Sequence, residues 1–370
     1  MILKSSGETK LATIEYCHHM VREILEEPSA LRKTISEEEG NIKKVAFEIE
    51  AKKYDIVYIT GSGTSYHAGL ASQYALSSLT DLIVSTIPAS EFQRWIPAVV
   101  TRKALLMAIS QSGESTDVVN AAKAALKRGI DLLAVTNTSE STLASLANYV
   151  ISPKSGREIA VPATKTYVTQ LMAIFMLSLE IAALREQKSK IDNVKRELYN
   201  VPQAIEKIFK SSRENIREAA EKYKDKNPMF ILGSGPNYAT ALEAALKLKE
   251  TCMVFAEGFA AREFLHGPIR LVDEKTLMIL ISPSDEVEEY ADLSKRFKGF
   301  GANVISILEE TEGSRPLMEA SDGFISIPAG FSKIFSPILF IVPIQLFTYY
   351  VSVFRGLNPD NPEKLVKVVK

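Results

Sequence analysis

The sequence predicts an α/β protein built from two tandem, doubly wound parallel sheets. Strand and helix patterns alternate along the chain, which is typical of parallel sheets with helices on both faces. Three landmarks also recur, each 172 residues after its first copy (233 − 61, 282 − 110 and 301 − 129). They are a glycine turn that ends a strand, a serine that ends a strand and a glycine that precedes one: Gly61 and Gly233, Ser110 and Ser282, and Gly129 and Gly301. Three segments in one register indicate an internal duplication.

Apolar runs of strand length and longer helical patterns place the expected elements in each half. In the first half the strands are expected at 55–60, 104–109 and 130–136, with weaker candidates at 81–87 and 148–151, and the helices at 64–79, 115–128 and 162–185. In the second half the strands are expected at 228–232, 276–282 and 302–307, and the helices at 236–251, 285–299 and 335–354.

The same pattern divides the chain into a leading helical segment and two domains. A polar helical stretch from about 186 to 225 joins the two halves. Pro28-Ser29 is the expected break between helices of the leading segment, because proline interrupts a helix interior. The regions are an N-terminal helical segment over 1–50, a first domain over 51–205, and a second domain with its C-terminal tail over 206–370.

Composition excludes several classes of partner. The 44 Lys+Arg and 45 Asp+Glu residues leave a formal charge of −1, so no overall field attracts nucleic acid or an anionic membrane. Cys17 and Cys252 are too few for a disulfide framework, which suits a reducing cytoplasm. No signal peptide is visible, and Pro343 interrupts the apolar run over 338–354. We therefore expect this run to be a buried core helix and the protein to be cytoplasmic.

Hydroxyl-rich loops follow two neighbouring strands of the first half. Gly61-Ser62-Gly63-Thr64-Ser65 opens one helix, and Ser110-Gln111-Ser112-Gly113-Glu114-Ser115 opens another. Helix N-termini, backbone N–H groups and hydroxyls together can surround a phosphate without a Lys or Arg. The alternative is ordinary helix capping, for which Ser and Thr are also preferred. Two such loops at adjacent strand ends favour a phosphate site.

Other anion sites fit less well. A dinucleotide fingerprint would need a third glycine where Tyr66 stands, so no nucleotide cofactor is expected. The corresponding loops of the second half contain Pro236, which lacks an N–H donor, and Asp285 and Glu286, which repel anions. We therefore expect only the first half to bind phosphate, with neither a metal nor a cofactor.

Several longer segments give the chain a family resemblance. It resembles the tandem sugar isomerase (SIS) domains that form the isomerase half of glutamine–fructose-6-phosphate amidotransferases, from about His19 to the C-terminus. The segments that carry the resemblance are Ser110-Gln-Ser-Gly-Glu114, Ala241-Leu-Glu-Ala-Ala-Leu-Lys-Leu-Lys-Glu250, Ala256-Glu257 with Arg262-Glu-Phe-Leu-His266-Gly-Pro268, and Asn361-Pro362 to Lys367.

The resemblance implies a role for each candidate site residue. Glu250 would move a proton between C1 and C2 of a sugar phosphate, and His266 would open the sugar ring, reaching the site of a neighbouring subunit in a homodimer. Lys367 would form a Schiff base with the ketose C2, with Lys247 close by. The residues implied to hold the phosphorylated hexose or hexosamine are Thr64, Ser65, Ser110, Gln111, Ser112, Ser115, Val161 and Ala163. The family commonly has Ser at the position of Ala163 and Thr at that of Ser115.

The residues alone leave other interpretations open. Glu243, Lys247 and Glu250 share one helix face and could form a solvated ladder of ion pairs. His266 precedes Gly-Pro and could cap a turn, and Lys367 lies in a Lys-rich tail that composition would place in solvent. Aldose–ketose chemistry needs a carboxylate, an acid/base and, for an imine, a partly neutral lysine in a dry or cationic surround. We therefore expect the tail to fold over the sugar site.

The nitrogen source separates the candidate reactions. The glutaminase domain of the resembling synthases begins with a nucleophilic Cys, whereas residue 2 here is Ile2, so we expect no such domain upstream. We therefore expect ammonia chemistry: a hexosamine-6-phosphate deaminase/isomerase that interconverts glucosamine 6-phosphate with fructose 6-phosphate and ammonia. The alternatives are a synthase subunit fed ammonia by a separate glutaminase, a plain aldose–ketose isomerase, and a non-catalytic sugar-phosphate sensor.

Overall fold

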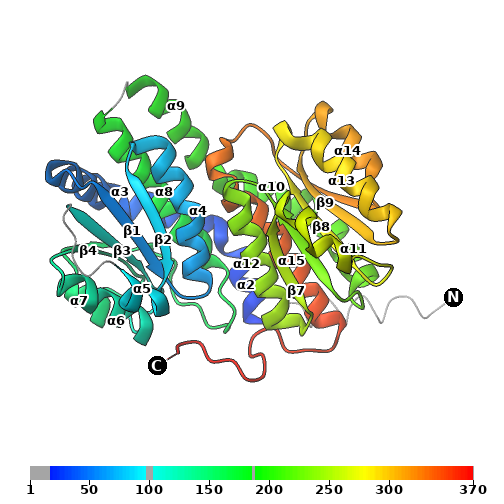
Figure 1. Cartoon of the computed structure of the whole chain (residues 1–370), viewed down its shortest axis with the longest axis horizontal. Helices are drawn as coiled ribbons and strands as arrows, with labels where there is room; N and C mark the ends of the chain where they lie inside the picture. The colour runs from blue at the N-terminus through cyan, green and yellow to red at the C-terminus, as the bar shows by residue number, and fades with distance from the viewer. Residues whose placement is uncertain (1–16, 97–102, 186–187, 370) are drawn as a thin grey trace.

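The computed structural model describes residues 17–96, 103–185 and 188–369. Its first half contains a five-stranded parallel sheet in the order β2-β1-β3-β4-β5 (Figure 1). The chain passes from β1 to β2 on one side and then returns to β3 on the other side of β1. The strand order therefore reverses beside β1, as in doubly wound sheets. The strands are β1 (Ile56–Gly61), β2 (Ile83–Pro88), β3 (Ala104–Ile109), β4 (Asp131–Val135) and β5 (Tyr149–Ile151).

The second half repeats the same sheet. Its order, β7-β6-β8-β9-β10, is the first order with each strand replaced by its counterpart, and all pairs are parallel. The expected fold class and duplication are confirmed. The two edge strands, β7 and β10, were not expected, because each is short and only partly buried. The strands are β6 (Met229–Gly233), β7 (Ala256–Ala260), β8 (Leu277–Ser282), β9 (Asn303–Glu309) and β10 (Gly323–Ile327).

Helices cover both sheets and join them. Those of the first half are α4 (Thr64–Thr80), α5 (Ala89–Trp95), α6 (Thr116–Leu126), α7 (Thr142–Leu146) and α8 (Lys165–Arg185). The polar connecting stretch forms α9 (Lys188–Tyr199), α10 (Val201–Ser211) and α11 (Arg213–Tyr223). Those of the second half are α12 (Pro236–Cys252), α13 (Val287–Gly299), α14 (Arg315–Ala320) and α15 (Pro337–Phe354), with short 3₁₀ turns between strands.

The leading segment forms two helices, α2 (His19–Leu25) and α3 (Glu27–Lys52). The expected break at Pro28-Ser29 is wrong, because the chain breaks at Glu26 instead. Pro28 lies in the first turn of α3, where its missing N–H would have had no partner inside the helix. Proline therefore starts this helix rather than ending the one before it.

The two halves meet along α4 and α12, which pack side by side at the centre of the molecule (Figure 1). Helices α8 and α15 are almost entirely buried, as expected for α15. By length and composition both could cross a membrane, but they are core helices here, with 83% and 94% of their most apolar windows buried. This packing brings the start of α4 beside the C-terminal half of α12.

Candidate functional site

A cavity of about 380 Å³ lies at the carboxyl ends of β1 and β3. Ligands of doubly wound sheets collect at this edge, where the strand order reverses. The loops after β1 and β3, the loop between β5 and α8, the end of α12 and the C-terminal tail meet there. The lining residues include Ser62, Gly63, Thr64, Ser65, Ser110, Gln111, Ser112, Ser115, Glu158, Val161, Ala163, Glu250 and residues 364–369. Ten of the twelve sequence candidates line the cavity, and the other two, Lys247 and His266, do not. 

The two hydroxyl-rich loops form one side of this cavity. Helix α4 begins at Thr64 and α6 at Thr116, so both N-termini face the same space. Ser110 Oγ accepts a hydrogen bond from the Gly113 N–H at 3.1 Å, which shapes the turn after β3. Ser115 is the N-cap residue of α6, yet its side chain makes no capping hydrogen bond in the described structure. Simple helix capping therefore does not account for this hydroxyl, which remains available to a ligand.

Gly113 makes the tight turn after β3 possible. Its φ of +67° is a left-handed conformation that L-residues other than glycine rarely adopt. A Cβ at this position would also collide with the Ser141 side chain. The turn brings the backbone of residues 111–115 against the cavity, where consecutive N–H groups can face an anion.

Two of the candidate hydroxyls have side-chain partners. Thr64 Oγ1 donates to Glu243 Oε1 at 2.9 Å, and Ser65 Oγ lies 3.1 Å from the Gln170 amide nitrogen, which donates to it. Glu243 belongs to α12, so the first of these bonds joins the loop after β1 in the first half to the central helix of the second. Gln170 and Glu243 are both buried. The loop after β1 is therefore held in place by buried residues of α8 and α12.

The charged face of α12 is buried, so the solvated-ladder interpretation is wrong. Lys247 has no exposed surface, and its Nζ contacts Glu250 Oε2 and lies 3.5 Å from Glu243 Oε1. Burial lowers the pKa of Lys247, but attraction to Glu250 and Glu243 outweighs it, so the pKa is raised overall. Lys247 is therefore an ammonium ion at neutral pH. Glu250 is the member of this set that reaches the cavity.

The C-terminal tail lines the cavity although much of it is also exposed, so Lys367 is not the free, solvated lysine that composition suggests. Lys367 Nζ donates to Glu158 Oε2 and to the Ala160 carbonyl oxygen, both at 2.7 Å. The Lys367 side chain is 25% exposed, whereas that of Glu158 is fully buried. The tail returns to the first half along the lower side of the molecule (Figure 1). It places a lysine on the far side of the cavity from the end of β1.

Backbone contacts fix the path of the tail. The Val161 N–H donates to the Asp360 carbonyl oxygen at 2.8 Å, where the tail meets the loop that follows β5. Near the end of the chain, the Thr116 N–H donates to the Val369 carbonyl oxygen at 3.4 Å, at the start of α6. The tail is therefore attached on both sides of Lys367, and residues between these points line the cavity.

His266 is not brought to this cavity. It ends the 3₁₀ turn Glu263–His266 after β7, is exposed, and is absent from the described residues that line the cavity. Within one chain, the structure therefore unites Glu250 with Lys367 but leaves His266 at another surface.

Sequence reasoning missed Glu158, Gln170 and His67. Glu158 lies in an irregular loop with no periodic signal, although its carboxylate accepts hydrogen bonds from the Thr164 and Thr166 N–H groups. His67 Nδ1 lies 2.8 Å from Glu243 Oε2. The sequence places Glu243 on one helix face with Lys247 and Glu250, but its link to the loop after β1 depends on the α4–α12 contact. That contact has no local sequence signature.

The equivalent loops of the second half are occupied by an ion pair. Lys333 Nζ lies 3.0 Å from Asp285 Oδ2 and also contacts Glu286 Oε1. Ser234 Oγ, after β6, lies 2.9 Å from the Tyr290 hydroxyl. Carboxylates neutralised by the chain's own lysine are a poor environment for a phosphate, in accord with the expected asymmetry.

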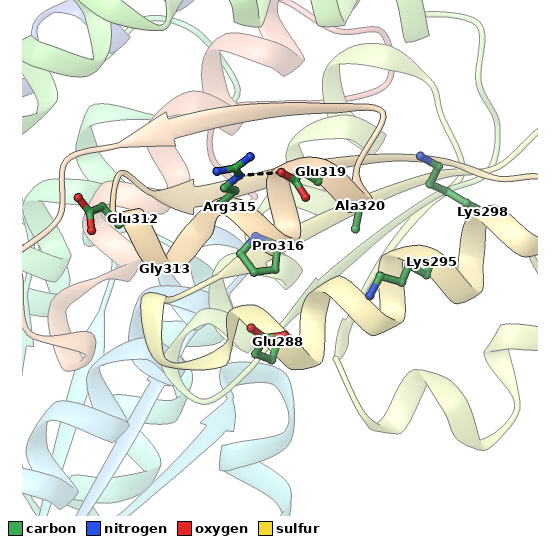
Figure 2. Close-up of a pocket in the computed structure, with 9 residues that line it drawn as sticks. All are labelled: Glu288, Lys295, Lys298, Glu312, Gly313, Arg315, Pro316, Glu319 and Ala320. Carbon is green, nitrogen blue, oxygen red and sulfur yellow. Dashed lines mark hydrogen bonds and ion pairs between the residues drawn. The ribbon is translucent and has the colours of Figure 1, made fainter.

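Another hollow lies on the second half between α13 and α14 (Figure 2). It is lined by side chains of both charges, and these pair locally: Arg315 Nε with Glu319 at 2.7 Å, and Lys298 with Asp322 at 3.0 Å. Its charged groups lie on the surface rather than in a buried site. The cavity beside β1 and β3 is therefore the candidate site.

Comparisons with known proteins assign the chain to a family. The family model described as "SIS domain" matches residues 51–179 and 222–355. The glutamine–fructose-6-phosphate aminotransferase (isomerizing) of Thermococcus kodakarensis is 37% identical over 357 residues, which cover 96% of this chain and 58% of the relative. That of Clostridium tetani is 36% identical, covering 96% and 59%. The chain thus spans somewhat more than half the length of these relatives.

Solved structures agree with this assignment. The C-terminal domain of glucosamine-fructose-6-phosphate aminotransferase from Francisella tularensis superposes with a TM-score of 0.87 at 29% identity, covering 93% of this chain and 98% of that one. A glucosamine-6-phosphate deaminase from Thermotoga maritima superposes with a TM-score of 0.75 at 25% identity, covering 95% and 99%.

Proposed function

Since this chain belongs to the SIS domain family, with two such domains in tandem, we propose that it is a phosphosugar isomerase that acts on amino sugars. The proposed reaction interconverts glucosamine 6-phosphate with fructose 6-phosphate and ammonia. The observation that carries the proposal is the single cavity in which hydroxyl-rich loops, Glu250 and Lys367 meet. The similarity to a deaminase structure over nearly its whole length adds support.

The phosphate of the sugar would bind between the loops after β1 and β3. Backbone N–H groups at the starts of α4 and α6 carry partial positive charge and would face the phosphate oxygens. Hydroxyls of Ser65, Ser110, Ser112 and Ser115, with the Gln111 side chain, would add donors. Val161 and Ala163 would contact the sugar carbons on the opposite wall.

Glu250 would transfer the proton between the two carbons. After ring opening, its carboxylate takes the proton from C2 of the amino aldose and returns it to C1, which leaves an imine at C2. The buried ammonium of Lys247 touches Glu250 and would hold its carboxylate in one orientation. It would also stabilise negative charge that develops on the sugar between the two steps.

Lys367 would release the nitrogen. Its amine adds to C2, the C2–N bond to ammonia breaks, and water then hydrolyses the lysine imine to give fructose 6-phosphate and regenerate the amine. Lys247 is unsuited to this role, because it is fully buried and does not line the cavity, whereas Lys367 does. Lys367 must leave Glu158 and Ala160 to reach the sugar, and its ammonium proton would pass to the Glu158 carboxylate as it becomes the free amine.

His266 would serve the site of a second copy of the chain. It is exposed on the second half and lies outside the cavity of its own chain, which suits a residue that reaches across a two-fold homodimer. In this arrangement each cavity is completed by the partner, and His266 would supply the acid/base for ring opening.

Related functions remain as competitors. A synthase subunit would run the same steps in reverse on ammonia from a separate glutaminase, and a plain isomerase would not need Lys367. A sensor would bind the sugar phosphate without turning it over. Incubation with glucosamine 6-phosphate, with free ammonia and ketose phosphate assayed together, tests the proposed reaction and separates it from the last two.

A further inference from the structure

The N-terminal helix α2 belongs to neither sheet, yet it carries a buried carboxylate toward the sugar cavity. Glu23 is 3% exposed. Its carboxylate accepts hydrogen bonds from two consecutive backbone groups, the Ile159 N–H on Oε1 and the Ala160 N–H on Oε2, the second at 3.3 Å. One carboxylate thus spans two peptide units of a loop that is 136 residues away in sequence.

That loop holds Lys367. The Ala160 carbonyl oxygen accepts from Lys367 Nζ, and Glu158, two residues earlier, accepts from the same nitrogen. The next residue, Val161, lines the cavity and is bonded to the Asp360 carbonyl oxygen. Glu23 therefore grips the backbone directly between the two acceptors of Lys367.

Helix α2 also holds the tail itself. The N–H groups of His19 and Met20, at its first turn, donate to the two carboxylate oxygens of Asp360 at 2.8 and 2.7 Å. A carboxylate at a helix N-terminus is favoured by the free amides and by the helix dipole. The loop over 158–161 and the tail meet at Lys367, a contact that we call the Lys367 clasp. Helix α2 contacts both of these segments, the loop through Glu23 and the tail through its own N-terminus.

We propose that Glu23 is a positioning residue, which sets the loop over 158–161 so that Lys367 is presented to the sugar. The proposal rests on the proposed function for the role of Lys367, but the geometry of the clasp does not depend on it. In this view α2 is part of the catalytic unit although it lies outside both sheets. Glu23 acts through the backbone of Ile159 and Ala160, not on the substrate.

The environment of Glu23 makes this positioning depend on pH. Burial raises the pKa of Glu23 to about 7, with a further upward contribution from Glu158, while the two N–H groups and Lys165 oppose the rise. The charged groups that act on it are Glu158 on the loop and Lys165 on α8, and Lys165 is itself paired with Glu26. An ionised Glu23 accepts both N–H groups, whereas protonation adds a donor where the loop offers donors. The grip should therefore weaken as the pH falls through about 7.

The test compares Glu23→Gln with the wild type on fructose 6-phosphate and glucosamine 6-phosphate between pH 5.5 and 8.5. At pH 8 we expect kcat to fall about ten-fold, the effect of one lost charge-assisted contact. The KM should change by less than about two-fold, because the phosphate loops are untouched. At pH 6 the wild type loses the same contact, so the ratio of the two rates should shrink toward one. A ratio that stays constant across this range would overturn the proposal.

Two further variants separate positioning from simple damage. Glu23→Asp keeps an ionisable carboxylate, so it should retain a pH-dependent rate at a lower level than the wild type. Glu37→Gln removes an exposed carboxylate paired with Lys33 on α3 and should behave as the wild type. Should Glu23→Gln fail to fold, as judged by circular dichroism, the Glu23→Asp profile decides: a pH profile parallel to that of the wild type supports the role, and a flat profile contradicts it.

A readout without turnover keeps this inference distinct from the proposed function. Amide hydrogen exchange of the peptides covering 158–161 and 360–369 should be faster in Glu23→Gln than in the wild type at pH 8, and unchanged in Glu37→Gln. If the wild type acts on no sugar phosphate, the proposed function fails while this comparison still tests the clasp. Equal exchange in all three proteins would show that Glu23 does not position the loop.

Discussion

Lys367 Nζ donates to Glu158 Oε2 at 2.7 Å, joining two residues that are 209 positions apart. Burial alone would raise the pKa of Glu158, but Lys367 and the Thr164 and Thr166 N–H groups outweigh it and lower the pKa overall. Glu158 is therefore ionised at neutral pH. A lysine three residues from the end of the chain is thus held at the cavity by a fully buried carboxylate.

The first prediction concerns Lys367. Lys367→Ala should abolish release of ammonia from glucosamine 6-phosphate, because no amine remains to form the imine at C2. Borohydride added with fructose 6-phosphate should attach one sugar to the wild type, at Lys367, as located by peptide mass spectrometry. Lys249→Ala, at an exposed position of α12 outside the cavity lining, is the control and should still be labelled at Lys367. Near-normal deamination by Lys367→Ala would rule out the imine role.

The second prediction concerns the phosphate loops. Ser110→Ala combined with Ser112→Ala should weaken binding of fructose 6-phosphate, since each hydrogen bond to a charged group contributes about 1.5–3 kcal/mol. Calorimetry measures the affinity, and thermal melting checks the turn that Ser110 supports. Ser284→Ala, in the corresponding loop of the second half, should bind normally. Equal turnover of glucosamine and its 6-phosphate would contradict a phosphate site.

The third prediction concerns the buried charges of α12. Lys247→Met leaves Glu243 and Glu250 without their cation, and removing one partner of a buried ion pair costs about 3–5 kcal/mol of unfolding free energy. Urea denaturation measures the loss. The exposed Lys249→Met, two residues along the same helix, should change stability by less than about 0.5 kcal/mol. A similar, small effect of both variants would mean that the α12 charges are screened by solvent.

The fourth prediction concerns assembly. His266→Ala and Glu250→Ala chains should each be inactive, because each lacks a group that every site needs. When the two are mixed and allowed to exchange subunits, mixed dimers should recover activity, since one of their two sites has both residues intact. Verified exchange without any recovery would show that each chain carries a complete site.

The fold could be predicted from the sequence because its signals are local and repeated. Gly61 and Ser110 mark the ends of strands and Gly129 precedes the start of one. Their copies 172 residues later repeat the pattern in the second sheet. The edge strand β7 was missed, because a five-residue strand containing Glu257 and Gly258 does not show a buried apolar run. The predicted helix break at Pro28 was wrong, because a proline at a helix start and a proline at a helix break look alike in sequence.

The site was predictable only in part. The meeting of the two hydroxyl-rich loops at one cavity could be inferred from the neighbouring strands that they follow, since parallel strands end at one edge. The burial of Lys247 could not, because it depends on how α4 packs on α12. The partnership of Lys367 with Glu158 could not either, because it joins two irregular segments with no periodicity. Their link to Glu23 through the Ala160 peptide likewise exists only in the folded chain.

The central claim is that one cavity binds a phosphorylated amino sugar and exchanges its nitrogen for oxygen as it isomerises. The most direct measurement is incubation of the purified protein with glucosamine 6-phosphate, assaying free ammonia and fructose 6-phosphate in the same samples over time. The account predicts that both products appear together in equal amounts, and that Glu250→Ala yields neither. The account would be contradicted if the protein binds fructose 6-phosphate but catalyses neither direction. In that case glucosamine 6-phosphate would yield no ammonia or ketose phosphate, and fructose 6-phosphate with ammonia would yield no glucosamine 6-phosphate.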